Sequence, residues 1–217
     1  MYFTNRAQAG EALTEELQDY RYKNCVVVAL TDGAVLVAEP IAHYLHATLA
    51  MLLAEQVEIP GEHQYVGTVN QDGGYAENSE ISEGEMDEYK TEFFNYIEEE
   101  KLRVFQKLNR LVTDGGAVDP AMLQDHDVIL VSDGLKTGAT LDAAAEFLKP
   151  IRLHRLVIAT PLASVGAVDR MHVLADELHC LNVVDNYLDT NHYYDNNKLP
   201  NHKQILAKIR QSVLNWK

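Results

Sequence analysis

Short apolar runs alternate with amphipathic segments along most of this chain. Predominantly apolar runs, typical of strands covered on both faces of a sheet, occupy residues 25–30, 127–131, 153–160 and 177–184. Apolar residues at helical spacing predict helices at 6–22, 35–45, 139–148, 164–174 and 202–214. Strands that alternate with helices are the signature of βαβ units, so the pattern predicts an α/β fold with a parallel sheet.

The middle of the chain interrupts this alternation. Strands are predicted at 48–56 and 65–69, and the second leads into a tight turn at 70–74. Between Asp72 and Leu102 the sequence holds eleven acidic residues and two lysines, so much of the negative charge is local. Residues 84–112 are helix formers with apolar positions for one inner face, which predicts a single long solvated helix.

The overall composition narrows the classes of partner. The 217 residues include 18 basic and 33 acidic ones, which gives a formal net charge of −15, and 47% are hydrophobic, as in an ordinary globular protein. The electrostatic field of such a negative net charge repels nucleic acid and anionic lipid, so neither is expected as a partner. Cys25 and Cys180 lie in apolar runs where inert thiols are expected, and the sequence holds neither an apolar leader nor a membrane span. We therefore expect a reducing, cytoplasmic location.

One segment carries the features of an anion-binding turn. The apolar residues 128–131 end a predicted strand, and the turn that follows reads Ser132, Asp133, Gly134, Leu135, Lys136, Thr137, Gly138, Ala139 and Thr140. Glycines let the backbone approach a ligand, helix-start N–H groups point outward and threonine hydroxyls donate, which suits a phosphate monoester. Asp133, at the carboxyl end of the strand, suits the hydroxyls of a sugar ring or a metal bridging them. The spacing matches neither a Walker A loop nor a dinucleotide-binding glycine motif.

The thirteen residues 128–140 resemble the phosphoribosyl pyrophosphate motif of type I phosphoribosyltransferases: four apolar residues, two acids, Gly, two variable residues, Thr, Gly, a variable residue and Thr. Similarity to a widespread bacterial phosphoribosyltransferase-domain family extends over nearly the whole chain, at Phe3, Asn5, Arg6, Ala9, Gly10, 28–38, Gly67, 72–74, 159–163 and 193–195. This resemblance implies a five-stranded parallel sheet flanked by helices, with a smaller hood. It further implies one domain over 1–217, with an acidic hairpin and helix insertion at 70–118 and a hood or C-terminal segment at 185–217.

The same resemblance implies a function. It predicts a site for phosphoribosyl pyrophosphate or a nucleoside monophosphate with Mg²⁺, transfer of ribose 5-phosphate to a nitrogenous base or amine, and a homodimer. By carry-over, residues 132–140 bind the substrate. Within this loop Thr137–Thr140 wrap the 5-phosphate, while Asp133 contacts the ribose hydroxyls and, indirectly, Mg²⁺. Asp133 and Lys136 are the candidate catalytic residues, with Lys136 as a phosphate contact.

Three departures from the family pattern weaken the pyrophosphate site. Ser132 replaces the first acid of the motif, Asp32 stands where the family has a basic residue, and Glu55 stands at the end of the predicted second strand, where relatives carry an Arg-Lys pair. Two functions therefore stay open: an active transferase with replacement cations from Lys136 or Arg103, or a catalytically degenerate nucleotide- or phosphosugar-binding module with a regulatory or interaction role. A transfer or cleavage reaction on a nucleoside monophosphate is a third.

Other candidate residues have a structural alternative. Arg103, Lys107 and Arg110 share one predicted helix face, where they either reach an anion or pair with nearby acids. Tyr193 and Tyr194 follow the last strand and either contact a base from the hood or pack beneath the closing helix. The histidines have no recognisable metal-ligand spacing, so no metal site is expected from them.

Overall fold

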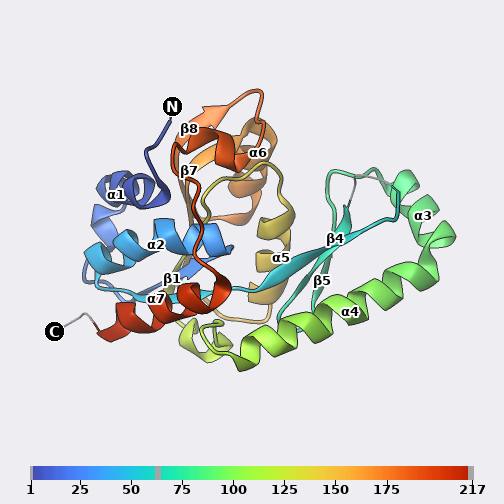
Figure 1. Ribbon diagram of the computed structural model, residues 1–217, viewed down its shortest axis with the longest axis horizontal. Helices are drawn as coiled ribbons and strands as arrows, with labels where there is room; N and C mark the ends of the chain where they lie inside the picture. Colours follow the sequence, from blue (N-terminus) through green and yellow to red (C-terminus); the bar gives the residue numbers. More distant parts are fainter. Residues whose placement is uncertain (1, 62–64, 215–217) are drawn as a thin grey trace. The chain divides into compact units, whose positions relative to one another are not determined.

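The computed structural model describes residues 2–61 and 65–214, which form two compact units (Figure 1). The first unit comprises residues 2–52, 116–137 and 151–214 of the described chain, and the second comprises the described part of 53–115 together with 138–150. None of the described helices is both long enough and apolar enough to cross a membrane.

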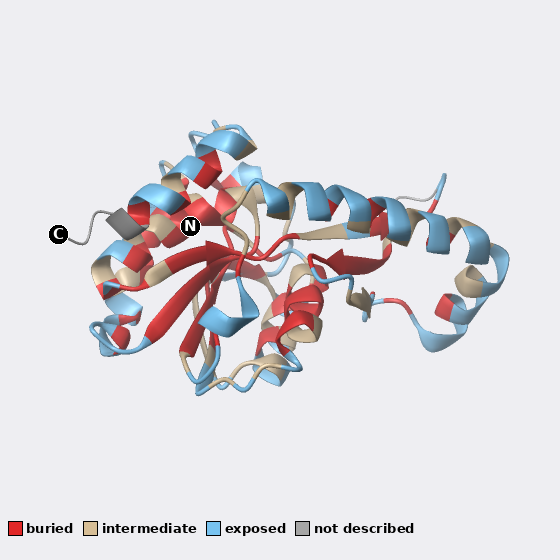
Figure 2. Cartoon of the chain, turned by 90° about the horizontal axis from the view of Figure 1, so that it is seen from below, coloured by how far each residue is buried: buried red, intermediate tan, exposed pale blue. Residues whose placement is uncertain are grey.

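The first unit is built on a five-stranded parallel sheet. Its strands, in the order in which they pair, are β2 (Thr48–Met51), β1 (Cys25–Ala29), β6 (Asp127–Val131), β7 (Arg155–Ser164) and β8 (Glu177–Val184). Every residue of β1 and β6 is buried, as the continuous apolar runs predict for the central strands of a parallel sheet (Figure 2). The predicted α/β fold and its parallel sheet are confirmed.

The helices of this unit are α1 (Arg6–Glu16), α2 (Asp32–Leu45), α6 (Val165–Leu174) and α7 (His202–Leu214), with short 3₁₀ turns at Gln18–Tyr20, Pro120–Met122 and Thr190–Tyr193. The predicted helix at 6–22 is too long, because α1 ends at Glu16 and a 3₁₀ turn follows. Conversely, α2 begins before the predicted residue 35. Thr31 is its N-cap, and the Thr31 side chain accepts a 2.9 Å hydrogen bond from the N–H of Ala34.

The second unit combines an antiparallel sheet with three helices. The sheet has the order β3 (Ala54–Glu58), β4 (Tyr65–Asn70) and β5 (Tyr75–Glu77), and the helices are α3 (Glu83–Glu92), α4 (Phe94–Thr113) and α5 (Ala139–Leu148). Helices α4 and α5 both pack on the strands of this sheet. Figure 2 shows that α4 is exposed over most of its length, and its buried residues are Ile97, Val104 and Leu108.

Two sequence predictions are wrong in this region. The strand predicted at 48–56 is two strands, because β2 pairs in parallel with β1 whereas β3 pairs in antiparallel with β4. Leu52 and Leu53, which lie between the two strands, are apolar, so the hydrophobic pattern does not show where one strand ends and the next begins. The single helix predicted at 84–112 is likewise two helices, which meet at Phe93, where the backbone leaves the helical region with φ −110° and ψ 21°. Helix formers on both sides of Phe93 give no sign of this break.

The segment after β8 lies beside the N-terminal residues in the first unit. Phe3 donates a 2.9 Å backbone hydrogen bond to the carbonyl of Tyr193 and accepts one of 3.0 Å from the N–H of Asp195. Phe3, Tyr193 and Tyr194 are buried together with Ala9 and Leu162. The predicted C-terminal segment at 185–217 therefore packs on α1 and β7 over its first residues, and residues 215–217 lie outside the described chain.

Candidate functional site

The loop after β6 is fixed to the neighbouring strand β7. Leu135 donates a 2.9 Å hydrogen bond to the carbonyl of Leu162 and accepts another of 2.9 Å from the N–H of Ser164. The hydroxyl of Ser164 also donates to the carbonyl of Lys136 over 2.8 Å. Because these bonds continue the sheet past the end of β6, β7 extends to Ser164 rather than to the predicted residue 160.

Asp133, the acid retained in this loop, is held in a buried ion pair. Its Oδ2 lies 2.7 Å from Nε of Arg6, the first residue of α1. Its other oxygen, Oδ1, accepts a 2.9 Å hydrogen bond from the hydroxyl of Thr31. Only 7% of Asp133 and 3% of Arg6 is exposed. The carboxylate charge is therefore compensated inside the first unit by Arg6, and Thr31 adds a neutral hydrogen bond from the start of α2.

Arg6 also joins this loop to the segment near the end of the chain. Its Nη2 donates to Oδ1 of Asn191 over 2.8 Å, and its guanidinium lies over the ring of Tyr194, 4.6 Å from the centroid. The hydroxyl of Tyr194 donates a 2.6 Å hydrogen bond to the main-chain carbonyl of Asp133. Burial raises the pKa of this phenol well above its ordinary value, so Tyr194 is a neutral donor at physiological pH.

Two glycines allow the chain to close around the loop. A Cβ on Gly33, in the first turn of α2, would overlap Oδ2 of Asp133. A Cβ on Gly134 would overlap the hydroxyl of Tyr187. Both positions therefore require the absence of a side chain, and the close approach encloses the carboxylate of Asp133 on the side of α2.

Ser132, which stands at the first acid position of the motif, serves the loop itself. Its hydroxyl donates to the carbonyl of Gly134 over 3.1 Å and accepts from the N–H of the same residue over 3.2 Å. Only 2% of Ser132 is exposed. Its polar side chain therefore stabilises a local turn.

The second half of the loop begins α5. The chain passes from the first unit to the second between Thr137 and Gly138, so each half has its own surroundings. Gly138 is the N-cap of α5 and offers no side chain to the N–H groups of the first turn, whereas α1, α2 and α6 have side-chain caps from Asn5, Thr31 and Ser164. The start of α5 therefore has no cap from the side chain of its N-cap residue, and the positive end of the helix dipole lies there.

The residues that replace the expected cations have partners of their own. Asp32 is the first residue of α2, and its Oδ1 lies 2.9 Å from Nδ1 of His202 at the start of α7. The expected position of Glu55 is wrong, because this residue lies in β3 of the second unit, paired with Lys107 at 2.7 Å, and not at the end of β2. The residues that follow β2 are Leu52 and Leu53, both buried.

Among the other candidate side chains, those of Arg103, Tyr193 and Tyr194 take part in packing or ion pairs. Arg103 pairs with Glu100 one turn earlier on α4, which is the salt-bridge alternative. Tyr193 and Tyr194 are both buried, which corresponds to the packing alternative rather than to open base contacts. Lys136 is exposed at the middle of the loop.

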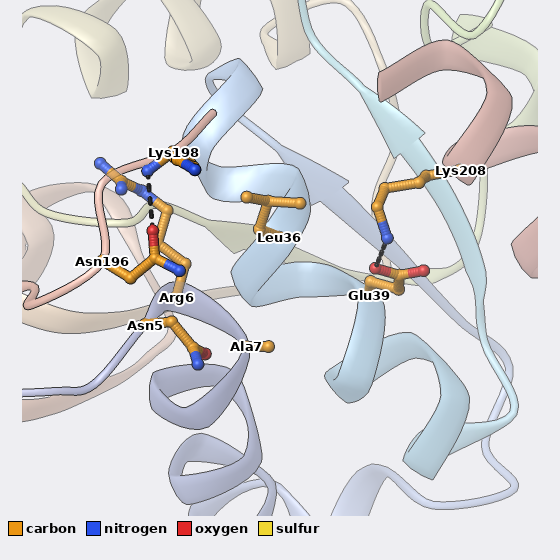
Figure 3. Close-up of a pocket in the computed structure, with 8 residues that line it drawn as sticks. All are labelled: Asn5, Arg6, Ala7, Leu36, Glu39, Asn196, Lys198 and Lys208. Atoms are coloured by element: carbon orange, nitrogen blue, oxygen red, sulfur yellow. Dashed lines mark hydrogen bonds and ion pairs between the residues drawn. The ribbon is translucent and has the colours of Figure 1, made fainter. Parts of the chain in front are cut away.

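Arg6 is the residue at this site to which the sequence assigned no role. The sequence feature that could have identified it is its position directly after the capping residue Asn5, within the opening segment that resembles the family. A small cavity of about 150 Å³ lies beside Arg6. Figure 3 shows the residues that line it, which also include Asn5, Ala7, Leu36, Glu39, Asn196, Lys198 and Lys208. Lys208 is paired with Glu39 at 2.8 Å, so opposite charges meet at one side of this cavity.

Comparisons with known proteins cover most of the chain. Residues 2–195 match the model of the phosphoribosyl transferase domain. Two Mycobacterium tuberculosis proteins whose names describe them as phosphoribosyl transferases, Rv0571c and MT0597, are each 28% identical over 180 residues, 82% of this chain. The chain spans 40% of the length of each of these relatives.

A solved structure resembles the chain over nearly its full length. The crystal structure of TT1426 from Thermus thermophilus is 27% identical, with a TM-score of 0.76, and the alignment covers 97% of this chain and 99% of that one. The parallel sheet, the loop after β6 and the family match over residues 2–195 lead to one conclusion: the chain belongs to the phosphoribosyl transferase domain family.

Proposed function

We propose that this chain binds a phosphoribosyl ligand, a nucleoside monophosphate or a phosphorylated sugar, through its 5-phosphate at the 132–140 loop and acts as a nucleotide-binding or phosphosugar-binding module. The observation that carries the proposal is the ion pair between Arg6 and Asp133. It withdraws the remaining acid of the motif into the protein, while the phosphate-binding part of the motif, from Thr137 to Thr140, is retained in the sequence.

A phosphate suits the second half of the loop. The N-cap residue Gly138 has no side chain to cap the first turn of α5, and the helix dipole favours an anion there. Thr137 and Thr140 are both half-buried and place hydroxyl groups at the start of this helix. The resemblance of residues 128–140 to the phosphoribosyl pyrophosphate motif gives this part of the loop its expected role, the binding of a 5-phosphate.

The first unit is poorly suited to binding pyrophosphate. Transfer from phosphoribosyl pyrophosphate needs cations that stabilise the charge of the leaving group. Asp32 supplies a carboxylate at the start of α2, and the buried Leu52 and Leu53 supply no charge at the end of β2. These residues favour a ligand with a single phosphate.

The residues of the loop also do not fit Mg²⁺. This ion prefers oxygen ligands such as carboxylates. Oδ2 of Asp133 lies 2.7 Å from the Arg6 guanidinium, so a divalent cation at Asp133 would meet a buried positive charge. Within residues 2–61 and 65–214, no group of three or more His, Cys, Asp or Glu side chains is arranged to hold a metal ion. The proposed binding of a monophosphate is accordingly independent of Mg²⁺.

Ribose 5-phosphate transfer is the second candidate function. Lys136 favours it, because this lysine is exposed directly before Thr137 and is the cation nearest in sequence to the proposed phosphate site. An active enzyme would need this lysine to replace the lost pyrophosphate contacts. It would also show a strong preference for phosphoribosyl pyrophosphate over ribose 5-phosphate.

Isothermal titration calorimetry tests both candidates. Phosphoribosyl pyrophosphate, ribose 5-phosphate and a panel of nucleoside monophosphates are titrated into the protein, with Mg²⁺ and with a chelator. We expect monophosphates to bind equally in both conditions. Tight binding of the pyrophosphate compound alone, dependent on Mg²⁺, would support the transferase instead, and a protein that binds none of these compounds would refute the proposal.

A pair of variants locates the binding. Thr137→Ala combined with Gly138→Val removes a hydroxyl and blocks the backbone approach, so monophosphate affinity should fall by about tenfold or more. The matched control is Thr91→Ala combined with Gly84→Val in α3, where a Cβ on Gly84 meets no atom within 4 Å. The control should bind as the unmodified protein does. Equal binding by both variants would show that the loop assignment is wrong.

A further inference from the structure

Both acid positions of the motif are occupied by groups that the protein uses internally. A site that recognises the hydroxyls of a ribose ring needs acceptors that the ring can reach, and an ionised carboxylate is the strongest side-chain acceptor for this purpose. At the first position, the Ser132 hydroxyl both donates to and accepts from Gly134. At the second position, Asp133 bonds Arg6 through one oxygen and Thr31 through the other.

The surroundings of Asp133 restrict access to the lone pairs that remain. The first turn of α2 closes over Oδ2, where a Cβ on Gly33 would overlap this atom. The main-chain carbonyl of Asp133 also has a partner, because it accepts a hydrogen bond from the Tyr194 hydroxyl. With 7% of the residue exposed, little of Asp133 is open to a ligand.

A sugar hydroxyl cannot easily displace the partners of Asp133. Arg6 is itself buried, and moving the carboxylate away from it would leave a positive charge without compensation. A ribose diol is neutral, so it supplies no charge to replace the carboxylate beside the guanidinium. The ion pair is therefore expected to persist when a ligand is bound.

We propose that this chain does not recognise the ribose hydroxyls of its ligand, and that Arg6, by holding Asp133, is the residue that determines this. The inference rests on the proposed function and narrows its substrate class. The site accepts 5-phosphate esters of ribose and of 2-deoxyribose with similar affinity. Discrimination among ligands then comes from the phosphate and from the group attached to the sugar.

A comparison of matched ligands tests this inference. Ribose 5-phosphate is titrated against 2-deoxyribose 5-phosphate, and adenosine 5′-monophosphate against its 2′-deoxy form, by calorimetry on the unmodified protein. We expect each pair to agree within about threefold. A site that hydrogen-bonds the 2-hydroxyl would lose about tenfold or more when that group is absent, so a preference of that size for the ribose forms overturns the inference.

The other outcomes separate this inference from the function on which it rests. If none of the four ligands binds, the proposed function fails and the inference falls with it. If they bind with a strong ribose preference, binding at the loop stands and only the inference fails. Equal binding that is lost in the variant with Thr137→Ala and Gly138→Val supports both.

Asp133→Asn gives a second readout within the same series. If the carboxylate does not contact the ligand, this variant should leave the ratio of ribose to deoxyribose affinities unchanged, whatever its effect on stability. The control is Asp119→Asn, an exposed carboxylate in the first unit that caps the 3₁₀ turn at Pro120–Met122. A selective loss of affinity for the ribose forms in Asp133→Asn, absent from the control, would contradict the inference.

Discussion

The hydroxyl of Tyr194 donates a 2.6 Å hydrogen bond to the main-chain carbonyl of Asp133, on the same residue whose carboxylate bonds Arg6. The backbone and the side chain of one loop residue are thus held from two directions. Because the ring of Tyr194 also lies beneath the Arg6 guanidinium, the three residues form one connected unit. The position of the loop after β6 therefore depends on residues from both ends of the chain.

Tyr194→Phe should lower the stability of the protein. The substitution keeps the buried ring but leaves the carbonyl of Asp133 without its donor, which we expect to cost about 1–3 kcal/mol of unfolding free energy. Urea denaturation followed by circular dichroism measures the change. Tyr2→Phe, which removes an exposed hydroxyl bonded to His192, is the control and should change stability by less than about 0.5 kcal/mol. Equal effects of the two substitutions would contradict the role given to Tyr194.

Arg6→Met should be more damaging than Tyr194→Phe. It leaves the Asp133 carboxylate buried without its charged partner, and removing one member of a buried ion pair typically costs about 3–5 kcal/mol. The double variant with Asp133→Leu removes both charges and should recover part of the lost stability. Denaturation of the two single variants and the double variant gives the coupling energy. Strictly additive losses would mean that the two side chains do not interact in solution.

Gly33→Ala should destabilise the protein although alanine favours helices. Its Cβ would overlap Oδ2 of Asp133, and forced overpacking of this kind costs about 1–3 kcal/mol. Gly166→Ala is a matched control, because each glycine is the second residue of its helix and a Cβ on Gly166 meets no atom within 4 Å. The control should be neutral or slightly stabilising in thermal unfolding. A neutral Gly33→Ala would show that the start of α2 does not press on Asp133.

The stability of the first unit should fall at alkaline pH in part through Tyr20. Burial, followed by the hydrogen bond to Glu177, raises the pKa of this phenol to about 12 from an ordinary value of 10.0. The folded state therefore holds the Tyr20 proton more tightly than the unfolded state does. Its contribution is fully present below pH 10 and is lost as the pH rises from about 10 to 12.

Tyr20→Phe isolates this contribution from that of the other buried tyrosines. The unfolding free energies of the protein and of the variant are measured by denaturation at pH 8 and at steps up to pH 12. We expect the stability of the variant to decline less steeply above pH 10. Parallel declines would show that Tyr20 does not titrate with a raised pKa.

The sequence was sufficient where local pattern decides the structure. The strand Asp127–Val131 and the helix Ala139–Leu148 have the predicted limits, because a continuous apolar run ends at a polar residue and the helix follows Gly138. The same segment identified the family, and that identification is confirmed by the match over residues 2–195. The roles predicted for the loop residues and the homodimer stay predictions, whereas the proposed function replaces the predicted role of Mg²⁺ with binding that does not need this ion.

The remainder depends on partners that are distant in sequence. Nothing near Thr48 or Glu55 indicates that β2 pairs with β1 whereas β3 pairs with β4. Likewise, Arg6 and Asp133 are 127 positions apart, so neither residue alone reveals that the two charges cancel. An acid at the end of a strand looks like a ligand contact in the sequence, and only its tertiary partner shows how it is used.

The pairing of Phe3 with the residues around Tyr194 also has a consequence for synthesis of the chain on the ribosome. The backbone partners of Phe3 are Tyr193 and Asp195, which leave the ribosome long after α1 has emerged. Until then Arg6 has neither Asn191 nor Tyr194 to contact. The first unit therefore completes its folding late, and a nascent chain stalled before residue 190 would leave Phe3 and Arg6 without these partners, although α1 could already pack on α2.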